Sequence, residues 1–291
     1  MKRTAMAEQK YGNEKPVLRV LCWSGGADST AACINGHISP NDTNRIDLIV
    51  FSEVMFDRNY FGNGVGISGE LPEQIRFIYA AKQVFESWGY NVAIISDPER
   101  DYMWEFNHII QRSADNQGYS AGFPLAKKCS IQRDLKVACA RKFLAELRKD
   151  YNVIEVLGYT AEETERILGM RKRNGIHAGY RETAPLADAG ITHKAAIALC
   201  EQYNLLSPIY KYVDPSLPDR KIRSGCWFCP WAKVSEMAQF KMESCCGSEV
   251  FQKFIELENR EDIAYRNWNY KTHESLKERN EKVVQFIVDY M

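Results

Sequence analysis

The sequence of 291 residues has no long hydrophobic run and no segment typical of a secretory signal. No uninterrupted apolar stretch approaches the roughly 20 residues that a helix needs to cross a bilayer. The first 16 residues are polar, whereas a signal peptide has an apolar core. Internal repeats and low-complexity tracts are also missing. We therefore expect a cytoplasmic protein that has no membrane partner.

An excess of charge is missing too, because Lys plus Arg and Asp plus Glu both total 38. Such a balance does not by itself imply nucleic acid or an anionic membrane as a partner, so any such surface must be local. With 45% hydrophobic and 26% charged residues, the chain is able to bury a full core. We divide it into a polar tail over residues 1–16, a main domain over 17–233 and a helical C-terminal extension over 234–291.

The hydrophobic pattern over the first half of the main domain alternates between strands and helices. The predicted strands are Val17–Trp23, Ile46–Ser52, Val92–Ile95 and Val153–Gly158. The predicted helices are Thr30–Asn35, Pro72–Trp88, Tyr102–Arg112 and Ile131–Leu147, and, after a stretch of loops, His193–Tyr203, Glu249–Asn259 and Glu274–Tyr290. This alternation predicts an α/β fold, in which helices flank a parallel sheet and a ligand crevice lies at the carboxyl ends of the strands.

The segment Ser24–Ser29 lies between the first predicted strand and the helix that follows it. Its glycines allow the backbone to approach a phosphate closely, and free amides at the helix start can donate hydrogen bonds to phosphate oxygens. The hydroxyls of Ser24, Ser29 and Thr30 can do the same, and Asp28 can serve Mg²⁺ or the amides of the loop. The alternative is an ordinary strand-to-helix turn that Asp28 or Ser29 caps.

The pattern Ser-Gly-Gly-x-Asp-Ser after the first strand resembles the signature of PP-loop ATP pyrophosphatases, which bind ATP or a related adenine nucleotide. Four further segments are similar to the phosphoadenosine phosphosulfate (PAPS) reductase family: Cys129 with Arg133 and Lys136, Gly158 with Glu163 and Arg166, Leu205–Tyr210, and Gly225–Pro230. The resemblance covers approximately residues 17–233 and is closest to a bacterial and phage branch with Ile67–Glu73 after the second strand. It implies the adenine nucleotide alpha hydrolase-like fold, although Ala27 stands where many relatives carry lysine.

The family pattern also implies roles for charged residues near the loop. Lys136 and Arg166 would neutralise phosphate charge, and Glu163 would hold Mg²⁺ or ribose, unless it only begins a helix. The run Arg171–Arg173 is expected to be a solvated surface. The predicted catalytic residues are Asp28, Lys136 and Arg166, and the predicted nucleotide-binding residues are Ser24, Gly25, Gly26, Asp28, Ser29, Thr30 and Glu163.

Nine cysteines without a signal segment favour free thiols or metal ligands over a disulfide framework. Cys226 and Cys229 form a Cys-x-x-Cys knuckle that can direct two thiolates at one metal. The resemblance adds Cys129 as a third ligand and implies a [4Fe-4S] cluster, while structural zinc and free thiols stay open. Candidates for a fourth ligand are Cys200, Cys245 and Cys246, and the cysteines expected to pack in the core are Cys22, Cys33 and Cys139.

Three functions are compatible with these motifs. The resemblance implies sulfur transfer or phosphosulfate reduction with an iron–sulfur cluster and a thiol reductant. No cysteine follows Cys246, however, whereas those reductases carry their nucleophile in a C-terminal Glu-Cys-Gly segment. The second function is ATP-dependent adenylation of a nucleic-acid base, a sulfur carrier or a small acceptor, with structural zinc. The third is a noncatalytic nucleotide or redox sensor, and a homodimer is compatible with each.

Overall fold

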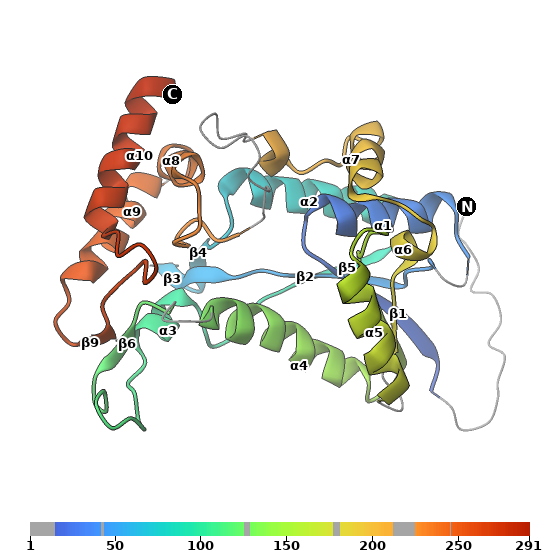
Figure 1. Cartoon of the computed structure of the whole chain (residues 1–291), viewed down its shortest axis with the longest axis horizontal. Helices are drawn as coiled ribbons and strands as arrows, with labels where there is room; N and C mark the ends of the chain where they lie inside the picture. The colour runs from blue at the N-terminus through green and yellow to red at the C-terminus, as the bar shows by residue number, and fades with distance from the viewer. Residues whose placement is uncertain (1–14, 42–43, 125–128, 177–180, 212–224, 245) are drawn as a thin grey trace.

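The computed structural model describes residues 15–41, 44–124, 129–176, 181–211, 225–244 and 246–291. Five parallel strands form the central sheet in the order β5-β2-β1-β7-β8 (Figure 1). These strands are β1 (Val17–Trp23), β2 (Leu48–Ser52), β5 (Asn91–Ile95), β7 (Asn152–Val156) and β8 (Arg181–Thr183). The predicted α/β fold with a parallel sheet is confirmed, and β8 adds a strand that the sequence pattern did not show.

Helices cover both faces of the sheet, because successive residues of a strand point to opposite sides. Leu21 and Trp23 of β1 belong to a core on the face of α1, α2 and α7, whereas Val20 packs with Leu144 of α4 on the other face. Figure 1 shows α1, α2 and α7 on one side of the sheet and α4 on the other. The flanking helices are α1 (Ala27–Ile38), α2 (Pro72–Ser87), α4 (Ala138–Leu147), α6 (Pro185–Asp188) and α7 (His193–Gln202).

Two predicted helices differ from those observed. α3 (Tyr102–Asn107) ends five residues before Arg112, because the backbone becomes extended at His108 and the next residue bridges to Ser120. The predicted helix Ile131–Leu147 begins as a π-helix over Ile131–Val137 and continues as α4. π-Helical turns are rare overall but frequent at functional sites, so this turn is a candidate part of one.

The pattern also missed several elements. The hairpin turn between β3 and β4 contains Asn63 and Gly64, both with positive φ, which is the Asn-Gly signature of a tight hairpin. α5 buries only Met170, so it lacks the apolar periodicity that reveals a helix. The missed elements are β3 (Met55–Gly62), β4 (Val65–Ser68), β6 (Ser120–Gly122), α5 (Thr164–Ile176), α6, a 3₁₀ turn (Pro208–Lys211), α8 (Val234–Glu243) and β9 (Ile263–Tyr265).

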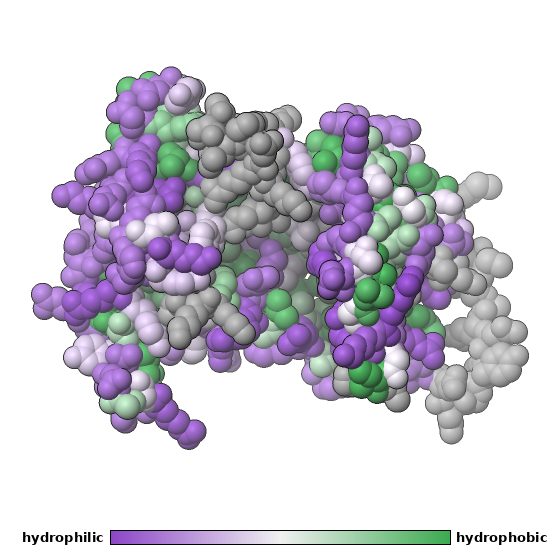
Figure 2. All heavy atoms as spheres, in the orientation of Figure 1, coloured by the Kyte–Doolittle hydropathy of each residue, from purple (hydrophilic) through white to green (hydrophobic). Residues whose placement is uncertain are grey.

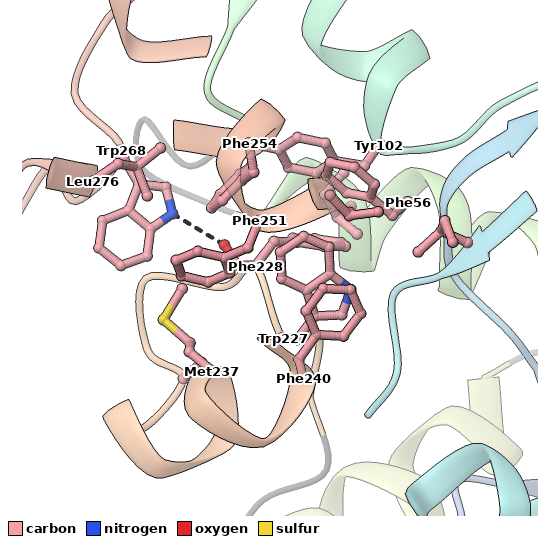
Figure 3. Close-up of a cluster of buried hydrophobic side chains, with 14 of the residues drawn as sticks. Phe56, Tyr102, Trp227, Phe228, Met237, Phe240, Phe251, Phe254, Trp268 and Leu276 are labelled. Atoms are coloured by element: carbon pink, nitrogen blue, oxygen red, sulfur yellow. Dashed lines mark hydrogen bonds between the residues drawn. The ribbon is translucent and has the colours of Figure 1, made fainter. Parts of the chain in front are cut away.

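The C-terminal extension joins the main domain through a core of aromatic side chains (Figure 3). Trp227 of the cysteine knuckle stacks on Phe240 of α8, with ring centroids 3.8 Å apart and planes 7° apart. Trp268 donates from Nε1 to the Phe228 carbonyl at 3.0 Å, and Phe56 of β3 packs in the same core. The extension comprises α8, α9 (Gly247–Glu256), a 3₁₀ turn (Leu257–Asn259), β9 and α10 (Leu276–Tyr290).

Hydrophilic residues cover most of this extension on the face shown in Figure 2, but hydrophobic side chains reach the surface toward the end of α10. Val288 and Tyr290 there are 74% and 70% exposed. Within the described ranges, every helix is too short or too polar to span a bilayer.

Candidate functional site

The loop after β1 lies where the connections of the sheet change direction. From β1 the chain moves to β2 and β5 on one side, and later to β7 and β8 on the other. At such a switch point the loops of two neighbouring strands diverge and leave a crevice outside their carboxyl ends. A cavity of about 360 Å³ lies here, and its walls are Cys22, Ser24, Gly26, Ala27, Asp28, Ser29, Leu157, Gly158, Tyr159, Arg166 and Tyr210. The predicted phosphate loop therefore lines a cavity at the predicted edge of the sheet.

Two glycines permit the close packing around this crevice. Gly25 has a φ of +75°, and a Cβ there would lie 2.6 Å from Ile78 Cδ1. A Cβ on Gly158 would lie 2.8 Å from both N and Cα of Ser29. Gly158 thus lets the chain after β7 approach the backbone of the first turn of α1. Both walls of the crevice depend on residues that have no side chain.

The hydroxyls of the loop face two different ways. Ser24 Oγ and Ser29 Oγ lie 3.1 Å apart, and the Ser24 amide donates to Ser29 Oγ at 3.2 Å. Both serines line the crevice. Thr30 is fully buried instead, and its Oγ1 accepts from Trp23 Nε1 at 2.9 Å. The Thr30 hydroxyl thus holds α1 on β1 from the core, and its predicted phosphate contact finds no support in this position.

Asp28, in the first turn of α1, is held by a residue that the sequence did not suggest. His193 Nδ1 lies 2.7 Å from Asp28 Oδ1. Burial raises the pKa of Asp28, and the hydrogen bond and charge of His193 oppose that shift. His193 begins α7 directly after Thr192, whose side chain caps the helix. His193 contacts one carboxylate oxygen, and the second oxygen can serve a ligand in the crevice.

Arg166 brings positive charge to the crevice from α5. Its guanidinium carbon lies 4.1 Å from the centre of the Tyr159 ring, and it forms an ion pair with Glu163. Burial lowers the pKa of Arg166, but Glu163 and Tyr159 together raise it by more, so the guanidinium is held in its charged form. Glu163 Oε2 also accepts from the Thr160 amide at 3.1 Å. Glu163 therefore acts as the helix-start acid and positions Arg166, while a contact to Mg²⁺ or ribose stays a prediction.

Lys136 lies outside the walls of the crevice, on the π-helical turn beside the cysteine knuckle. Its Nζ is 3.2 Å from Glu70 Oε1 and 5.6 Å from the centre of the Phe51 ring. Burial lowers the pKa of Lys136, but Glu70 and Cys226 raise it by more. Lys136 is therefore a charged partner of the buried Glu70 carboxylate near the cysteines. Its contact with a phosphate stays a prediction.

The three predicted metal ligands line one small cavity, of about 30 Å³. They are Cys129, Cys226 and Cys229, and the other walls are mostly apolar or aromatic: Tyr102, Phe123, Pro124, Ile131, Phe228, Pro230 and Trp268. Burial raises the pKa of Cys226 well above its usual value, Glu70 adds to the shift, and Lys136 opposes it. The sequence thus identified three thiols that the fold brings together from segments almost 100 residues apart.

The donor set of this cavity consists of three thiols, which are soft ligands. Three soft sulfur ligands are typical of zinc or iron–sulfur sites. The buried Tyr102 hydroxyl beside them has no hydrogen-bond partner among the described residues, so a polar contact is still to be made there. In the described ranges, no group of three or more His, Cys, Asp or Glu side chains is arranged to hold a metal.

The three candidates for a fourth ligand lie in different places. Cys246 packs against the core that contains the three thiols. Cys200 lies in the core beside α1, where its Sγ donates to the Ala27 carbonyl at 3.3 Å. Cys245 is outside the described residues. Of the two described candidates, only Cys246 belongs to the same core as the cavity.

One segment contacts both the cysteine knuckle and the loop after β1. Trp227 donates from its amide to the Gly69 carbonyl at 2.9 Å and from Nε1 to the Ser68 carbonyl at 3.0 Å. A few residues later, Gln74 of α2 is buried against the phosphate loop, with Nε2 3.5 Å from the Gly25 carbonyl. The segment from Ser68 to Gln74 therefore connects the cysteine knuckle with the loop after β1.

No protein-family model and no curated protein matches the chain. The functional argument therefore rests on the two cavities. Among their residues, His193, Gln74 and Tyr102 were not predicted, and no local signal in the sequence marks them. Tyr210 lies in a segment that the family resemblance covers, but its contact, an oxygen 3.0 Å from the Ala27 amide, follows only from the fold.

Proposed function

We propose that the chain is an enzyme of the PP-loop ATP pyrophosphatase type, which binds ATP between β1 and β7 and adenylates an acceptor with release of pyrophosphate. The observation that carries this proposal is that the loop Ser24–Ser29 and Gly158 line one cavity at the switch point of a parallel sheet. Open α/β sheets bind ligands at this position, and a phosphate at the start of a helix meets free amides and the positive end of the helix dipole.

In this proposal the chain holds the phosphates and compensates their charge. The amides at the start of α1 and the hydroxyls of Ser24 and Ser29 donate to phosphate oxygens. The Ala27 amide exchanges its hydrogen bond to the Tyr210 hydroxyl for one to the nucleotide. An acceptor oxygen attacks the α-phosphorus, the bond to the bridging oxygen breaks, and pyrophosphate leaves with the electron pair. Arg166 stabilises the negative charge that develops on the phosphates.

The residues of the crevice also fit the magnesium ion that accompanies ATP. Mg²⁺ is usually held by one or two carboxylates together with substrate phosphates, and it supplies charge neutralisation at those phosphates. Asp28 offers one partly exposed carboxylate at the right place, and His193 fixes its orientation. Asp28 is therefore the residue that would hold the ion.

The test measures ATP binding by calorimetry and pyrophosphate release with nucleic-acid, sulfur-carrier and small acceptors. We expect Asp28→Ala and Arg166→Ala to lose most of the ATP affinity. The exposed Arg171 on the same helix as Arg166 provides the matched control, so Arg171→Ala should bind like the wild type. Equal ATP affinity in all variants would overturn the nucleotide site. ATP binding without pyrophosphate release from any acceptor would favour a noncatalytic sensor.

A second candidate, sulfur transfer or reduction, rests on the three thiols that share one cavity. Cys22 is the cysteine that lines the crevice itself, and burial raises its pKa to about 12, so it is a poor nucleophile at neutral pH. Sulfur chemistry would therefore have to use Cys129, Cys226 and Cys229 through an iron–sulfur cluster. Metal and acid-labile sulfide analysis of protein purified without oxygen separates the two candidates, because sulfide with iron supports sulfur chemistry and stoichiometric zinc without sulfide supports adenylation.

A further inference from the structure

A second, larger groove adjoins the cysteine cavity. It has a volume of about 890 Å³, near the upper end of the roughly 300–1,000 Å³ of ligand pockets. Its walls come from α3 and the loop after it, β6, the π-helical turn and β9: Arg100, Trp104, Glu105, His108, Ile110, Arg112, Ser113, Ala121, Gly122, Phe123, Pro124, Ser130, Arg133, Asp134 and Tyr265. Phe123 and Pro124 also line the cysteine cavity, so the two spaces share a wall.

A ladder of stacked side chains forms one wall of this groove. The Arg100 guanidinium carbon lies 4.4 Å from the centre of the Trp104 ring. The His108 ring stacks on Trp104 with centroids 5.1 Å apart and planes 17° apart. The three residues are four positions apart in sequence, and Trp104 is 40% exposed. Nucleobases stack on aromatic rings and on arginine guanidinium planes in the same way, so the ladder can be continued by a base.

Glu105 places an unsatisfied acceptor in the same groove. The side chain is buried, and Oε1 has no hydrogen-bond partner among the described residues. The ion pair with Arg100 is long, with Nη1 3.9 Å away. Burial raises the pKa of Glu105 and Asp134 adds to the shift, whereas His108, Arg100 and a hydrogen bond with Ser130 oppose it. A ligand with an amine would supply the missing donor, and the amino groups of adenine and cytosine are donors of this kind.

Arginines on the rim can take the phosphates. Arg112 is exposed and forms no ion pair within the described ranges. Arg133 makes two hydrogen bonds to Asp134, at 2.7 and 2.5 Å, and a guanidinium has five N–H groups, so it has donors left for a phosphate. Three arginines thus face two carboxylates in a chain that has no net charge.

We propose that this groove binds a single-stranded nucleic acid, with an adenine or cytosine base stacked on the Arg100–Trp104–His108 ladder and its amine on Glu105. The phosphates lie on Arg112 and Arg133. This site is separate from the crevice between β1 and β7, so the proposal does not depend on nucleotide chemistry there. A free nucleotide has the same recognition chemistry, and the experiment distinguishes the two sources.

The experiment follows fluorescence anisotropy of labelled short homopolymers of adenylate, cytidylate and uridylate against the full chain at several salt concentrations. We expect the adenylate and cytidylate strands to bind more tightly than uridylate, which has no amine. Glu105→Gln should abolish this preference, because an amide both donates and accepts. Arg112→Ala should lower the affinity for every strand and reduce by about one the slope of log affinity against log salt concentration. Trp104→Ala should lower the affinity on the order of tenfold.

The control is Arg141→Ala, an exposed arginine on α4 outside the groove, which should bind like the wild type. Arg112 is also exposed, so its variant tests the site even if Trp104→Ala unfolds. The proposal is overturned if neither Arg112→Ala nor Arg141→Ala changes the affinity for the strand. It is also overturned if no strand binds at low salt. Loss of strand binding in Asp28→Ala but not in Arg112→Ala would place the strand in the crevice after β1 and overturn the proposal. AMP or CMP could also compete as strongly as the unlabelled strand. That result would assign the groove to a free nucleotide and overturn the proposal that it binds a strand.

Discussion

His193 and Asp28 are 165 positions apart in the chain, yet Nδ1 of the imidazole lies 2.7 Å from Oδ1 of the carboxylate. The contact joins the first turn of α7 to the first turn of α1 at the wall of the crevice between β1 and β7. Burial would favour a protonated Asp28, and His193 works against this by its hydrogen bond and charge. The pair therefore keeps a partly buried carboxylate available for a cation.

Replacing His193 should change how Mg·ATP binding depends on pH. The folded pKa of Asp28 lies above its ordinary value, and the ionised form binds the cation, so affinity is lost as pH falls through that folded pKa. His193→Ala removes two contributions that lower this pKa, and the loss of affinity should begin at a higher pH. Near neutral pH we expect a decrease of about tenfold, in keeping with a hydrogen bond to a charged group. Calorimetry over a pH series measures it, with His193→Gln as the variant that retains a donor. Identical pH profiles for wild type and His193→Ala would contradict this role.

Gly158→Ala should damage the nucleotide crevice. The added Cβ would lie 2.8 Å from two backbone atoms of Ser29, so the chain after β7 must move away from α1. Overpacking of this kind costs typically about 1–3 kcal/mol, and ATP affinity should fall because the walls of the crevice separate. Gly175→Ala is the matched control, since that position in α5 is open and alanine favours a helix by about 1 kcal/mol. Thermal unfolding and ATP titration measure both effects, and an unchanged ATP affinity in Gly158→Ala would show that the close approach is unimportant.

Cys22 should resist alkylation at pH 8 in the folded protein. Burial raises its pKa to about 12, and Glu155 adds to the shift, so the reactive thiolate is scarce at that pH. Reactivity should rise only as the pH approaches that value. Iodoacetamide labelling followed by peptide mass spectrometry measures it, and the urea-unfolded protein, in which all nine cysteines are accessible, is the control. Rapid labelling of Cys22 in the folded state would restore it as a candidate nucleophile.

Tyr102→Phe should have opposite effects on the metal-free and metal-bound protein. Without metal, the substitution removes a buried hydroxyl that lacks a partner, so it should stabilise the fold by up to about 1–3 kcal/mol. With zinc, it removes a donor next to the thiolates, and loss of such supporting contacts typically weakens metal binding about 10–100-fold. Thermal unfolding with chelator and with zinc measures both, and Tyr265→Phe, at an exposed position, should change neither. A destabilised metal-free variant would show that the hydroxyl has a partner after all.

The sequence predicted the parts of the structure that depend on local patterns. β1, β2, β5 and β7 are mostly apolar, and α2 follows from its periodicity, because buried parallel strands and amphipathic helices are set by their own residues. The apolar pattern did not predict α5, because only Met170 is buried along this helix. The hairpin of β3 and β4 did carry a signal, the Asn63-Gly64 pair, which the pattern of apolar residues alone does not weigh.

The candidate site was predictable only where its residues form motifs. Ser24–Ser29 and the Cys226-x-x-Cys229 knuckle are contiguous, and the family resemblance added Cys129 and Arg166 at the cavities where the structure places them. Thr30 was assigned to phosphate from its position in the loop, but the twist of the helix buries it against Trp23. His193 and Gln74 reach the loop only through the packing of α7 and α2, which no single stretch of sequence specifies.

The segment between Ser68 and Gln74 sets how far apart the two cavities can lie. Because it is hydrogen-bonded to the cysteine knuckle at one end and packed on the phosphate loop at the other, the chain itself has little freedom to bring the cavities together. Under the proposed chemistry, a group that passed between the two cavities would have to cover this distance itself, and a long, flexible acceptor would meet that requirement better than a compact one.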